Sequence, residues 1–287
     1  LQAAYELSLK SLIKKYSEPQ CVVDHELFSP ALSIIGYGKL GGYELHYQSD
    51  LDIIFLHNSA GTKQHTSGIK CIDNAVFFSR LAQKIISKIS LLTAAGKLYE
   101  IDTRLRPDGA SGMLVSPLQA YEYYQLEKAW VWEHQAIIRA RFIAGNRDIQ
   151  KPFESIRRQV ISLPRDKTDL QKAIIEMRQK MYQVKKPPEG QTINIKHSRG
   201  CMVDIEFLVQ YWVLKHANKF AGLIESTDNI ALISELHHLG LITDQDLQLR
   251  DIYPTFHKWL HARVLQNQSA EIDSELVRDE IDMVKTC

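Results

Sequence analysis

The sequence contains few cysteines, no excess of charge of either sign and no long apolar run. The four cysteines lie far apart and form no CxxC pair, which favours free thiols in a reducing cytoplasm over a disulfide framework or a zinc site. Lysine and arginine total 35 against 34 aspartate and glutamate residues, so bulk attraction to nucleic acid or to a membrane surface is not expected. No apolar stretch approaches the roughly 18 residues that a transmembrane helix needs. We therefore expect a cytoplasmic protein without nucleic-acid or membrane partners.

The chain of 287 residues is long enough for one large domain or two ordinary ones. It opens with LQAAYELSLK, without an initiator methionine or the layout of a signal peptide, which is expected of a segment cut from a longer protein and equally of an engineered or processed start. Near ISLPRDKTD, at residues 161–169, mixed helix and strand signals give way to mainly helical ones. We predict a mixed-sheet α/β (α+β) domain over residues 1–160 and an all-helical bundle domain over residues 161–287.

Hydrophobic spacing predicts the main elements of both domains. Apolar residues at helical spacing predict helices over residues 2–16, about 72–93, 117–127 and 204–217. The apolar runs ALSIIG and LDIIFLH predict buried strands over residues 31–36 and 51–57, and the alternation in KLYEIDTRLR predicts a half-buried strand over residues 97–106. Residues 57–68 are polar and predict a loop, and residues 129–145 carry both helix and strand signals.

Two aspartates flank one leucine at the start of the predicted strand 51–57. Asp50 and Asp52 stand at positions i and i+2, so their side chains point to one face about 7 Å apart. Two ionised carboxylates this close raise each other's pKa unless a cation lies between them, and Mg²⁺ suits such a site because it binds carboxylates together with substrate phosphates. A third acid from a neighbouring strand, Asp102 or Glu100, would complete a site for two Mg²⁺ ions that activates a hydroxyl and stabilises a leaving pyrophosphate.

The glycines that precede the aspartates fit the same scheme. The stretch GKLGG lets the backbone approach phosphate oxygens and present N–H groups to them. Arg104 and Arg106, on the same predicted strand face as Asp102, would be cationic partners for a triphosphate. A lone DxD is often only a solvated strand end, and the glycine-rich turn matches neither the P-loop nor the dinucleotide fingerprint. In the order glycine-rich turn, DxD strand, long helix and acid-bearing strand, however, the parts together predict a metal site that handles phosphates.

This order resembles that of the nucleotidyltransferase superfamily, whose members carry a glycine-rich turn followed by a Dx[DE] strand. The gap between Gly42 and Asp50 is short for that superfamily, so Gly36 or Gly38 would be the matching glycine. Longer stretches are more specific: GYGKLGGYELHYQSDLDIIFLH, EIDTRLRPDGASGMLV, WEHQAIIRAR and VDIEFLVQYWVLKHA resemble the glutamine synthetase adenylyltransferase (glutamate–ammonia-ligase adenylyltransferase) family. The resemblance covers nearly the whole chain and implies a nucleotidyltransferase-like first domain.

The resemblance also implies roles for individual residues. Asp50 and Asp52 would bind Mg²⁺, and Asp102 would be either the third metal ligand or the general base that takes a tyrosine proton. ATP would be the substrate. The residues implied in nucleotide binding lie in and around the glycine-rich turn and after Asp102: Gly38, Lys39, Gly41, Gly42, Ser49, Arg104 and Arg106.

Proteins of that family carry two nucleotidyltransferase halves, one that attaches AMP from ATP to a tyrosine of glutamine synthetase and one that removes it by phosphorolysis. The stretches GASGMLV and WEHQAIIRAR resemble the attaching, C-terminal half. The resemblance therefore implies an adenylyltransferase that releases pyrophosphate and down-regulates nitrogen assimilation. Its effectors would be glutamine and a PII-type nitrogen signal protein, and the N-terminal adenylyl-removing half would be missing from this sequence. The alternatives are the AMP-removing half and a catalytically idle regulatory module.

Further charged residues lie outside these motifs. The family resemblance suggests that Glu133, Arg139 and Arg141 border the active cleft, whereas a salt-bridged helix or strand face explains them equally well. Asp204 and Glu206 open a predicted helix, where capping and a favourable interaction with the helix dipole are the simpler explanation and a nucleotide or metal contact is the alternative.

Overall fold

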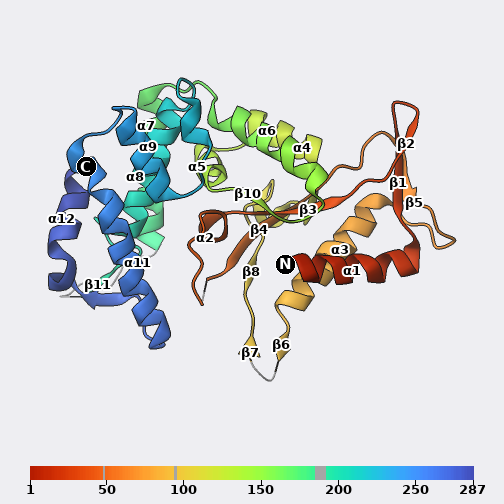
Figure 1. Cartoon of the computed structure of the whole chain (residues 1–287), viewed down its shortest axis with the longest axis horizontal. Coiled ribbons are helices and arrows are strands. Elements are labelled where there is room, and N and C mark those ends of the chain that lie inside the picture. Colours follow the sequence, from red (N-terminus) through yellow and green to blue (C-terminus); the bar gives the residue numbers. More distant parts are fainter. Residues whose placement is uncertain (48, 94–95, 185–191) are drawn as a thin grey trace. The chain divides into compact units, whose positions relative to one another are not determined.

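The computed structural model describes residues 1–47, 49–93, 96–184 and 192–287 (Figure 1). The chain divides into two compact units. The first comprises Leu1–Glu44, Ser49–Ala129 and Ala140–Val160, and the second comprises Trp130–Arg139, Ile161–Cys287 and a short segment that begins at Leu45. Each unit buries its own set of apolar side chains, so each has a hydrophobic core.

A mixed sheet forms the centre of the first unit. Its path runs β10-β3-β4-β8, and β9 also pairs with β4. The strands are β3 (Leu32–Gly36), β4 (Leu51–His57), β8 (Ile101–Asp102), β9 (Val115–Pro117) and β10 (Arg141–Gly145). Strand β3 lies antiparallel to β10 and β4, whereas β4 lies parallel to β8 and β9. Because β3 is buried throughout and β4 is buried except at Asp52, their sequences are continuous apolar runs, and both predicted buried strands are confirmed.

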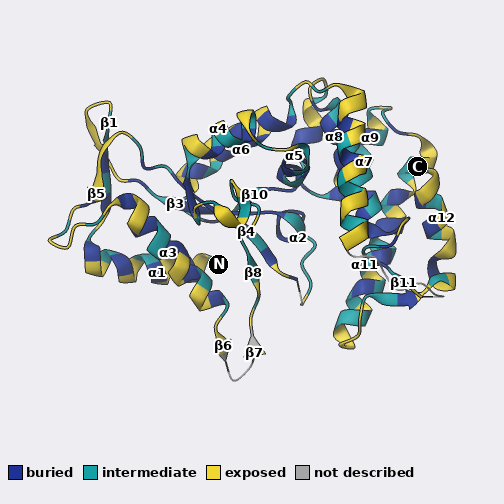
Figure 2. Ribbon diagram, turned by 180° about the vertical axis from the view of Figure 1, so that it is seen from behind, coloured by how far each residue is buried: buried dark blue, intermediate teal, exposed yellow. Residues whose placement is uncertain are grey.

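Helices pack against this sheet and against one another. They are α1 (Gln2–Tyr16), α2 (Gly38–Gly41), α3 (Asn74–Ile89), α4 (Leu118–Glu127) and α6 (Gln150–Ile161), with short 3-10 turns η1 (Gly109–Ser111) and η2 (Arg147–Ile149). Helix α1 lies along α3, and α4 packs on β4 and β9 (Figure 1). Dark blue buried faces and yellow exposed faces alternate along α1 and α3 (Figure 2), as expected for amphipathic helices on a core. The predicted helices 2–16 and 117–127 are confirmed.

The predicted helix 72–93 and the predicted loop 57–68 both need correction. Helix α3 ends at Ile89, and the chain continues into the short strand pair β6 (Leu92–Thr93) and β7 (Gly96–Lys97). Within the expected loop, β5 (Thr62–Thr66) pairs with β1 (Pro19–Val23), which also pairs with β2 (Glu26–Phe28). Four of the five residues of β5 are exposed. The strand therefore lacks the apolar alternation that predicts strands, and it exists because a distant segment supplies its hydrogen-bond partners.

The predicted strand 97–106 is wrong in extent. Lys97 ends β7, which pairs with β6, and Ile101 and Asp102 alone in this range pair with β4, as β8. The chain then turns, with the amide of Arg106 donating to the carbonyl of Thr103 at 3.2 Å. Beyond Asp102 the edge of β4 is taken by β9, in register from Phe55 and Val115 onward. Residues 105 and 106 could not continue the register of β8, because β9 already pairs with Phe55 and Leu56.

The second unit is mostly helical in its described part. Its helices are α5 (Val131–Ile138), α7 (Lys167–Val184), α8 (Met202–His216), α9 (Asn229–His238), α10 (Asp244–Leu247), α11 (Leu249–Leu265) and α12 (Arg278–Thr286), with 3-10 turns η3 (Ala221–Ile224) and η4 (Ser274–Val277). Helix α8 contacts α5, α7, α9 and α11. It confirms the predicted helix 204–217, and the mixed signals of residues 129–145 divide into α5 and β10. The unit is not all-helical, because β11 (Thr192–Asn194) pairs with β12 (Glu271–Asp273) across a large sequence separation that leaves no local pattern.

None of the helices in the described residues is both long enough and apolar enough to span a lipid bilayer.

Candidate active site

Two carboxylates lie on neighbouring parallel strands of the first unit. Asp52, the second residue of β4, is paired in register with Asp102, the last residue of β8. Residues paired in this way project to the same face of a sheet, on backbones about 4.8 Å apart. The carbonyl of Glu100 accepts a hydrogen bond from the Leu51 amide at 2.8 Å, just ahead of this ladder. Of the two acids predicted from the sequence, the register therefore brings Asp102 beside Asp52.

The glycine-rich turn packs directly on Asp52. The Tyr37 amide donates to the Asp52 carbonyl at 2.8 Å, and α2 begins at the next residue. Gly38 has a φ of 51°, and a Cβ placed on it would lie 2.5 Å from Oδ2 of Asp52. Glycine is required here twice, because the left-handed conformation disfavours a side chain and the carboxylate fills the space that one would need.

Arg141, from β10, holds the other end of this turn. Its Nε donates to the Gly41 carbonyl and its Nη2 to the Leu40 carbonyl, both at 3.0 Å. Its guanidinium also lies over the ring of Tyr43, 3.8 Å from the centroid. These contacts satisfy carbonyls at the C-terminal end of α2 and fix the turn against the sheet. Arg141 was predicted to border a cleft, and in the structure it supports the backbone of the glycine-rich turn.

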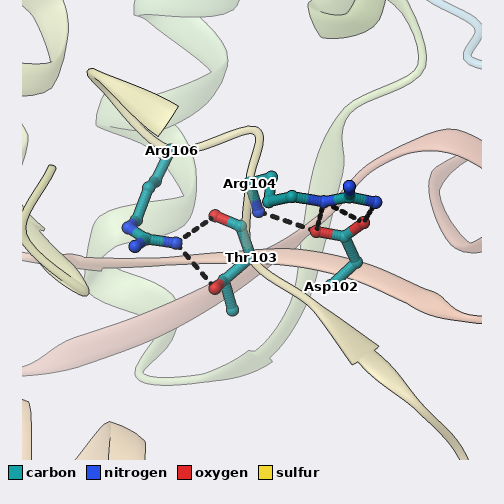
Figure 3. A network of polar contacts seen from close by, with 4 residues as sticks. All are labelled: Asp102, Thr103, Arg104 and Arg106. Atoms are coloured by element: carbon teal, nitrogen blue, oxygen red, sulfur yellow. Dashed lines mark hydrogen bonds and ion pairs between the residues drawn. The ribbon is translucent and has the colours of Figure 1, made fainter. Parts of the chain in front are cut away.

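Asp102 is held by Arg104, which turns back after β8 (Figure 3). The Arg104 amide donates to Oδ1 at 2.8 Å, and its Nε reaches Oδ1 at 3.0 Å and Oδ2 at 2.9 Å, with a further ion pair from Nη2. The hydrogen bonds from the Arg104 side chain hold the pKa of Asp102 below its ordinary value. Asp102 is therefore an ionised carboxylate at neutral pH.

Arg106 bonds to its own loop (Figure 3). Its Nη1 donates to the carbonyl and hydroxyl oxygens of Thr103 at 2.9 and 2.8 Å, and its other nitrogens reach the carbonyls of Gly112 and Ala110 at 3.2 and 3.1 Å. The prediction that Arg104 and Arg106 share a strand face with Asp102 is wrong, because both lie beyond the end of β8. Arg104 nevertheless reaches the Asp102 carboxylate, and Arg106 shapes the loop that follows.

The donor set fits a hard divalent cation in its chemistry. Hydrogen bonds to Asp102 raise the pKa of Arg104, and the charges of Asp52 and Asp50 raise it further, so three carboxylates act on one guanidinium. A cation is therefore already favoured at this position, and Arg104 supplies it. In the part of the chain that the structure describes, no three His, Cys, Asp or Glu side chains converge closely enough to hold a metal ion. Metal binding would thus require Arg104 to release Asp102.

The remaining residues predicted near the nucleotide lie in or beside the same turn. Lys39 belongs to α2, and its carbonyl accepts from the Glu44 amide at 2.8 Å. Gly41 and Gly42 end that helix and are buried, and the Gly42 amide donates to the Gly38 carbonyl at 2.9 Å. Ser49 is buried, and Asp50 is exposed immediately before β4. Their predicted roles in nucleotide and metal binding stay predictions.

Four residues predicted near a cleft lie in the second unit, where their contacts support helices. Oε2 of Glu133 accepts from the Trp130 amide at 2.9 Å and caps α5. Oε1 of Glu206 accepts from Nη1 of Arg139 at 3.1 Å and from the Tyr253 hydroxyl at 2.8 Å, which ties α8 to α5 and α11. Arg139 is buried, so this ion pair is partly desolvated.

Asp204 secures the start of α8. Its Oδ2 accepts from the Gly200 amide and its Oδ1 pairs with Arg178, whose Nη2 also donates to the His197 carbonyl at 2.9 Å. A carboxylate in the first turn that accepts a backbone N–H is the capping arrangement expected as the simpler explanation of Asp204.

Two tyrosine contacts near the turn were not predicted. The hydroxyls of Tyr37 and Tyr121 share a buried hydrogen bond of 2.6 Å, which links the turn to α4. Tyr43 stacks under Arg141 with a φ of 62°, although its side chain is largely exposed. The only sequence signal for them was the presence of tyrosines on either side of GKLGG, which by itself indicates no partner.

Carboxylates on adjacent strand ends beneath a glycine-rich turn are typical of enzymes that transfer phosphorylated groups with a divalent cation. Comparison with known sequences agrees with that class. The model of the family described as glutamate-ammonia ligase adenylyltransferase matches residues 1–156.

Curated relatives match over nearly the whole chain. A protein of Thioalkalivibrio sulfidiphilus (strain HL-EbGR7) is 44% identical over 286 residues, which are 99% of this chain and 30% of that protein. A protein of Nitrosococcus oceani is 40% identical over 281 residues, 98% of this chain and 29% of that protein. Both are named bifunctional glutamine synthetase adenylyltransferase/adenylyl-removing enzyme. The chain spans less than a third of the length of these relatives.

The chain belongs to the glutamate-ammonia ligase adenylyltransferase family, a family of nucleotidyltransferase enzymes.

Proposed function

We propose that this chain transfers AMP from ATP to a tyrosine hydroxyl of glutamine synthetase and releases pyrophosphate. In this proposal residues 1–160 form a nucleotidyltransferase-like catalytic domain, and residues 161–287 form a helical domain that docks the protein substrate or responds to regulators. Membership of the family and the names of the relatives support the reaction class. The observation that carries the proposal is the register of Asp52 with Asp102 beneath the turn at Gly38.

The residues around Asp52 have distinct tasks in this reaction. The tyrosine oxygen forms a bond to the α-phosphorus of ATP, the bond to the bridging oxygen of pyrophosphate breaks, and the phenol proton passes to Asp102 or to water. Mg²⁺, held by Asp50, Asp52 and Asp102, would neutralise charge on the reacting phosphates. The backbone of the glycine-rich turn, fixed by Arg141, presents N–H groups to the phosphate chain.

In this proposal Arg104 binds Asp102 in the absence of ATP and phosphate oxygens in its presence. Its side chain is 77% exposed and pairs with Asp102, whose own side chain is 18% exposed. When ATP binds, the guanidinium moves from the carboxylate to phosphate oxygens, and Asp102 becomes available to the cation. The Arg104 hydrogen bonds that lower the pKa of Asp102 are lost in this exchange, so Asp102 can then serve as the third metal ligand or as the general base.

The assignment to the attaching activity, and not to removal of AMP, depends on the resemblance of GASGMLV and WEHQAIIRAR to the attaching half. The relatives are named for both activities, so the choice needs a direct test. Glutamine and a PII-type signal protein complete the proposal as effectors.

The test is transfer of label from ATP labelled at the α-phosphate to unmodified glutamine synthetase in the presence of Mg²⁺. We expect label on a synthetase tyrosine with the unaltered chain, and a loss of about a hundredfold or more with Asp52→Asn, because a metal ligand is removed. Asp108→Asn is the matched control, since Asp108 is an exposed acid of the nearby loop with a φ of 59° that asparagine tolerates. Binding of Mn²⁺, followed by electron paramagnetic resonance, reports on the metal site independently of turnover.

Three outcomes decide the proposal. Transfer that needs Mg²⁺ and Asp52 supports it. Phosphate-dependent release of labelled ADP from adenylylated synthetase, without transfer, assigns the removing activity instead. Absence of both activities from folded chain supplied with glutamine and PII protein rejects catalysis in favour of a regulatory module.

A further inference from the structure

A groove on the first unit gathers positive charge without a matching acid. It consists of two adjoining hollows of about 500 and 650 Å³ that share Ser11 and Lys15. They run beside α1 and α3, which lie next to each other in both views (Figures 1 and 2). The hollows are lined by five cations, which define the α1–α3 basic groove: Lys14, Lys15, Lys70, Arg80 and Lys84. Among the described residues that line it there is no aspartate or glutamate.

This concentration of charge does not follow from the composition. The chain has a net charge of only +1. None of the five cations forms an ion pair with an acid in the described ranges of the chain. Arg80 and Lys84 stand four residues apart on α3, a spacing at which like charges destabilise a helix by about 0.2–0.5 kcal/mol. The groove thus costs stability in the isolated chain, and a bound anion would remove that cost.

Part of the groove is rigid before any partner arrives. Tyr16, at the end of α1, is buried, and its hydroxyl accepts a hydrogen bond from Nη1 of Arg80. The Lys15 ammonium lies 5.1 Å from the centroid of the same ring. A hydrogen bond from Lys15, together with the charges of Arg80 and Lys70, lowers the pKa of Tyr16. Arg80 and Lys15 are therefore positioned by a shared aromatic ring and create a positive potential there.

One edge of the groove presents an apolar side chain. The Ser67 amide donates to the Glu18 carbonyl at 3.0 Å, which holds the loop of residues 67–70 against the chain just after α1. A Cβ on Gly68 would lie 2.6 Å from the Ser17 hydroxyl, so the loop passes close to that helix end. The next residue, Ile69, is fully exposed beside Lys70. A partner that covers this isoleucine would make binding more favourable, by about 1.5–3 kcal/mol for full burial of the side chain.

We propose that the α1–α3 basic groove docks an acidic segment of a partner protein that carries an apolar side chain to cover Ile69. The five cations, which form no ion pair with a described acid, favour acidic side chains. Ile69 favours a protein partner, because a nucleic acid would present its sugar–phosphate backbone to this apolar side chain. The short extent of the groove and the neutral balance of the rest of the chain also disfavour a nucleic-acid track. This site is separate in sequence from the turn at Gly38 and from Asp52 and Asp102.

The first experiment measures binding of a short fluorescent peptide of glutamate and leucine by anisotropy. Lys14→Gln/Lys70→Gln/Lys84→Gln should raise the dissociation constant about tenfold, since each exposed charge contact contributes about 0.2–1 kcal/mol. Lys63→Gln/Lys128→Gln/Lys151→Gln removes the same charge from exposed positions of the same unit and should change it by less than about twofold. Each single change in the groove should weaken binding about twofold, which keeps the test available if the triple variant does not fold.

The second experiment separates the apolar contact from the charges. Ile69→Ser should weaken binding of the peptide that contains leucine and leave binding of a polyglutamate peptide unchanged, whereas Leu27→Ser, at another exposed apolar residue, should affect neither. Binding should also weaken as salt is added, because exposed charges are screened. Equal binding by the groove and control variants would overturn the proposal. So would tighter binding of a single-stranded oligonucleotide than of the peptide at the same salt concentration, or no binding of the acidic peptide at all.

Discussion

Gly38 is the residue on which the geometry of the candidate site depends most. It adopts a conformation that side chains disfavour, and the Asp52 carboxylate lies in the space where its Cβ would be. Any larger residue would have to displace either the turn or the carboxylate. The position of Asp52 and the path of the glycine-rich backbone are therefore coupled, so that a shift of one displaces the other.

Gly38→Ala should destabilise the first unit by about 1–2 kcal/mol for the conformation alone, and the clash with Asp52 adds to this. Gly240→Ala is the matched control, because Gly240 has a φ of 67° and no described atom lies within 4 Å of the place its Cβ would take. Urea denaturation followed by circular dichroism gives the two losses, and calorimetric titration gives MgATP affinity. We expect affinity to fall for Gly38→Ala only. An equal effect on affinity from both variants would contradict the coupling of Gly38 to Asp52.

Strand β4 is the element that joins the candidate site to the core. Its first half pairs with β8 at Asp52, and its second half pairs with β9 up to His57. His57 is buried and stacks on Phe78 of α3, with ring centroids 4.9 Å apart, and its Nδ1 accepts from the Ser59 amide at 3.1 Å. Burial lowers the pKa of His57 to about 4, from an ordinary value of 6.5. The C-terminal end of β4 is therefore held in the core by the contacts of a neutral imidazole.

This imidazole should make the first unit sensitive to acid. Between pH 6.5 and about 4 the unfolded chain binds a proton at His57 that the folded chain does not, so stability falls as pH falls through that window and is fully present above it. The loss amounts to about 3 kcal/mol at pH 4. Hydrogen exchange of β4 amides across this range measures it. His57→Gln should flatten the pH dependence, whereas His65→Gln, at an exposed histidine, should not; a slope that persists in His57→Gln would refute the assignment.

At the scale of the whole molecule, unfolding of the two compact units can be followed by different signals. All four tryptophans, Trp130, Trp132, Trp212 and Trp259, belong to the second unit, whereas Asp52 and Asp102 belong to the first. Tryptophan fluorescence therefore reports unfolding of the second unit alone. A ligand stabilises the structure to which it binds, in proportion to the logarithm of its concentration over its dissociation constant.

MgATP at about a hundredfold its dissociation constant should protect amides of β3 and β4 by about 2.7 kcal/mol in hydrogen exchange. The midpoint of the fluorescence transition should stay nearly constant, because the tryptophans lie in the unit without the proposed nucleotide site. Removing Mg²⁺ with a chelator should abolish the protection. A parallel shift of both signals would instead indicate that the two units unfold as one cooperative body, and protection without Mg²⁺ would contradict the metal-dependent site.

Local periodicity was sufficient for several elements. Strands β3 and β4 were visible as apolar runs because both of their faces are buried, and α1, α4 and α8 were visible because one side of each helix meets a core. Asp50 and Asp52 were predicted from a similarly local pattern, since two like charges at the start of an apolar strand are costly without a counterion. Asp102 or Glu100 was expected as a third acid from a neighbouring strand.

Other features were decided only when distant segments met. Strand β5 has almost no apolar pattern and forms because β1 pairs with it. Strand β8 stays short, and β9 occupies the edge of β4 from Phe55 onward. The reversal of Arg104 onto Asp102 follows from the early end of β8. The sequence alone indicated the buried faces of helices α1, α4 and α8 and of strands β3 and β4, and the acidic pair at Asp50 and Asp52, because both patterns depend on near neighbours along the chain. The tertiary structure decided which charge faces which, because hydrogen-bond partners and strand edges are shared among segments far apart in sequence.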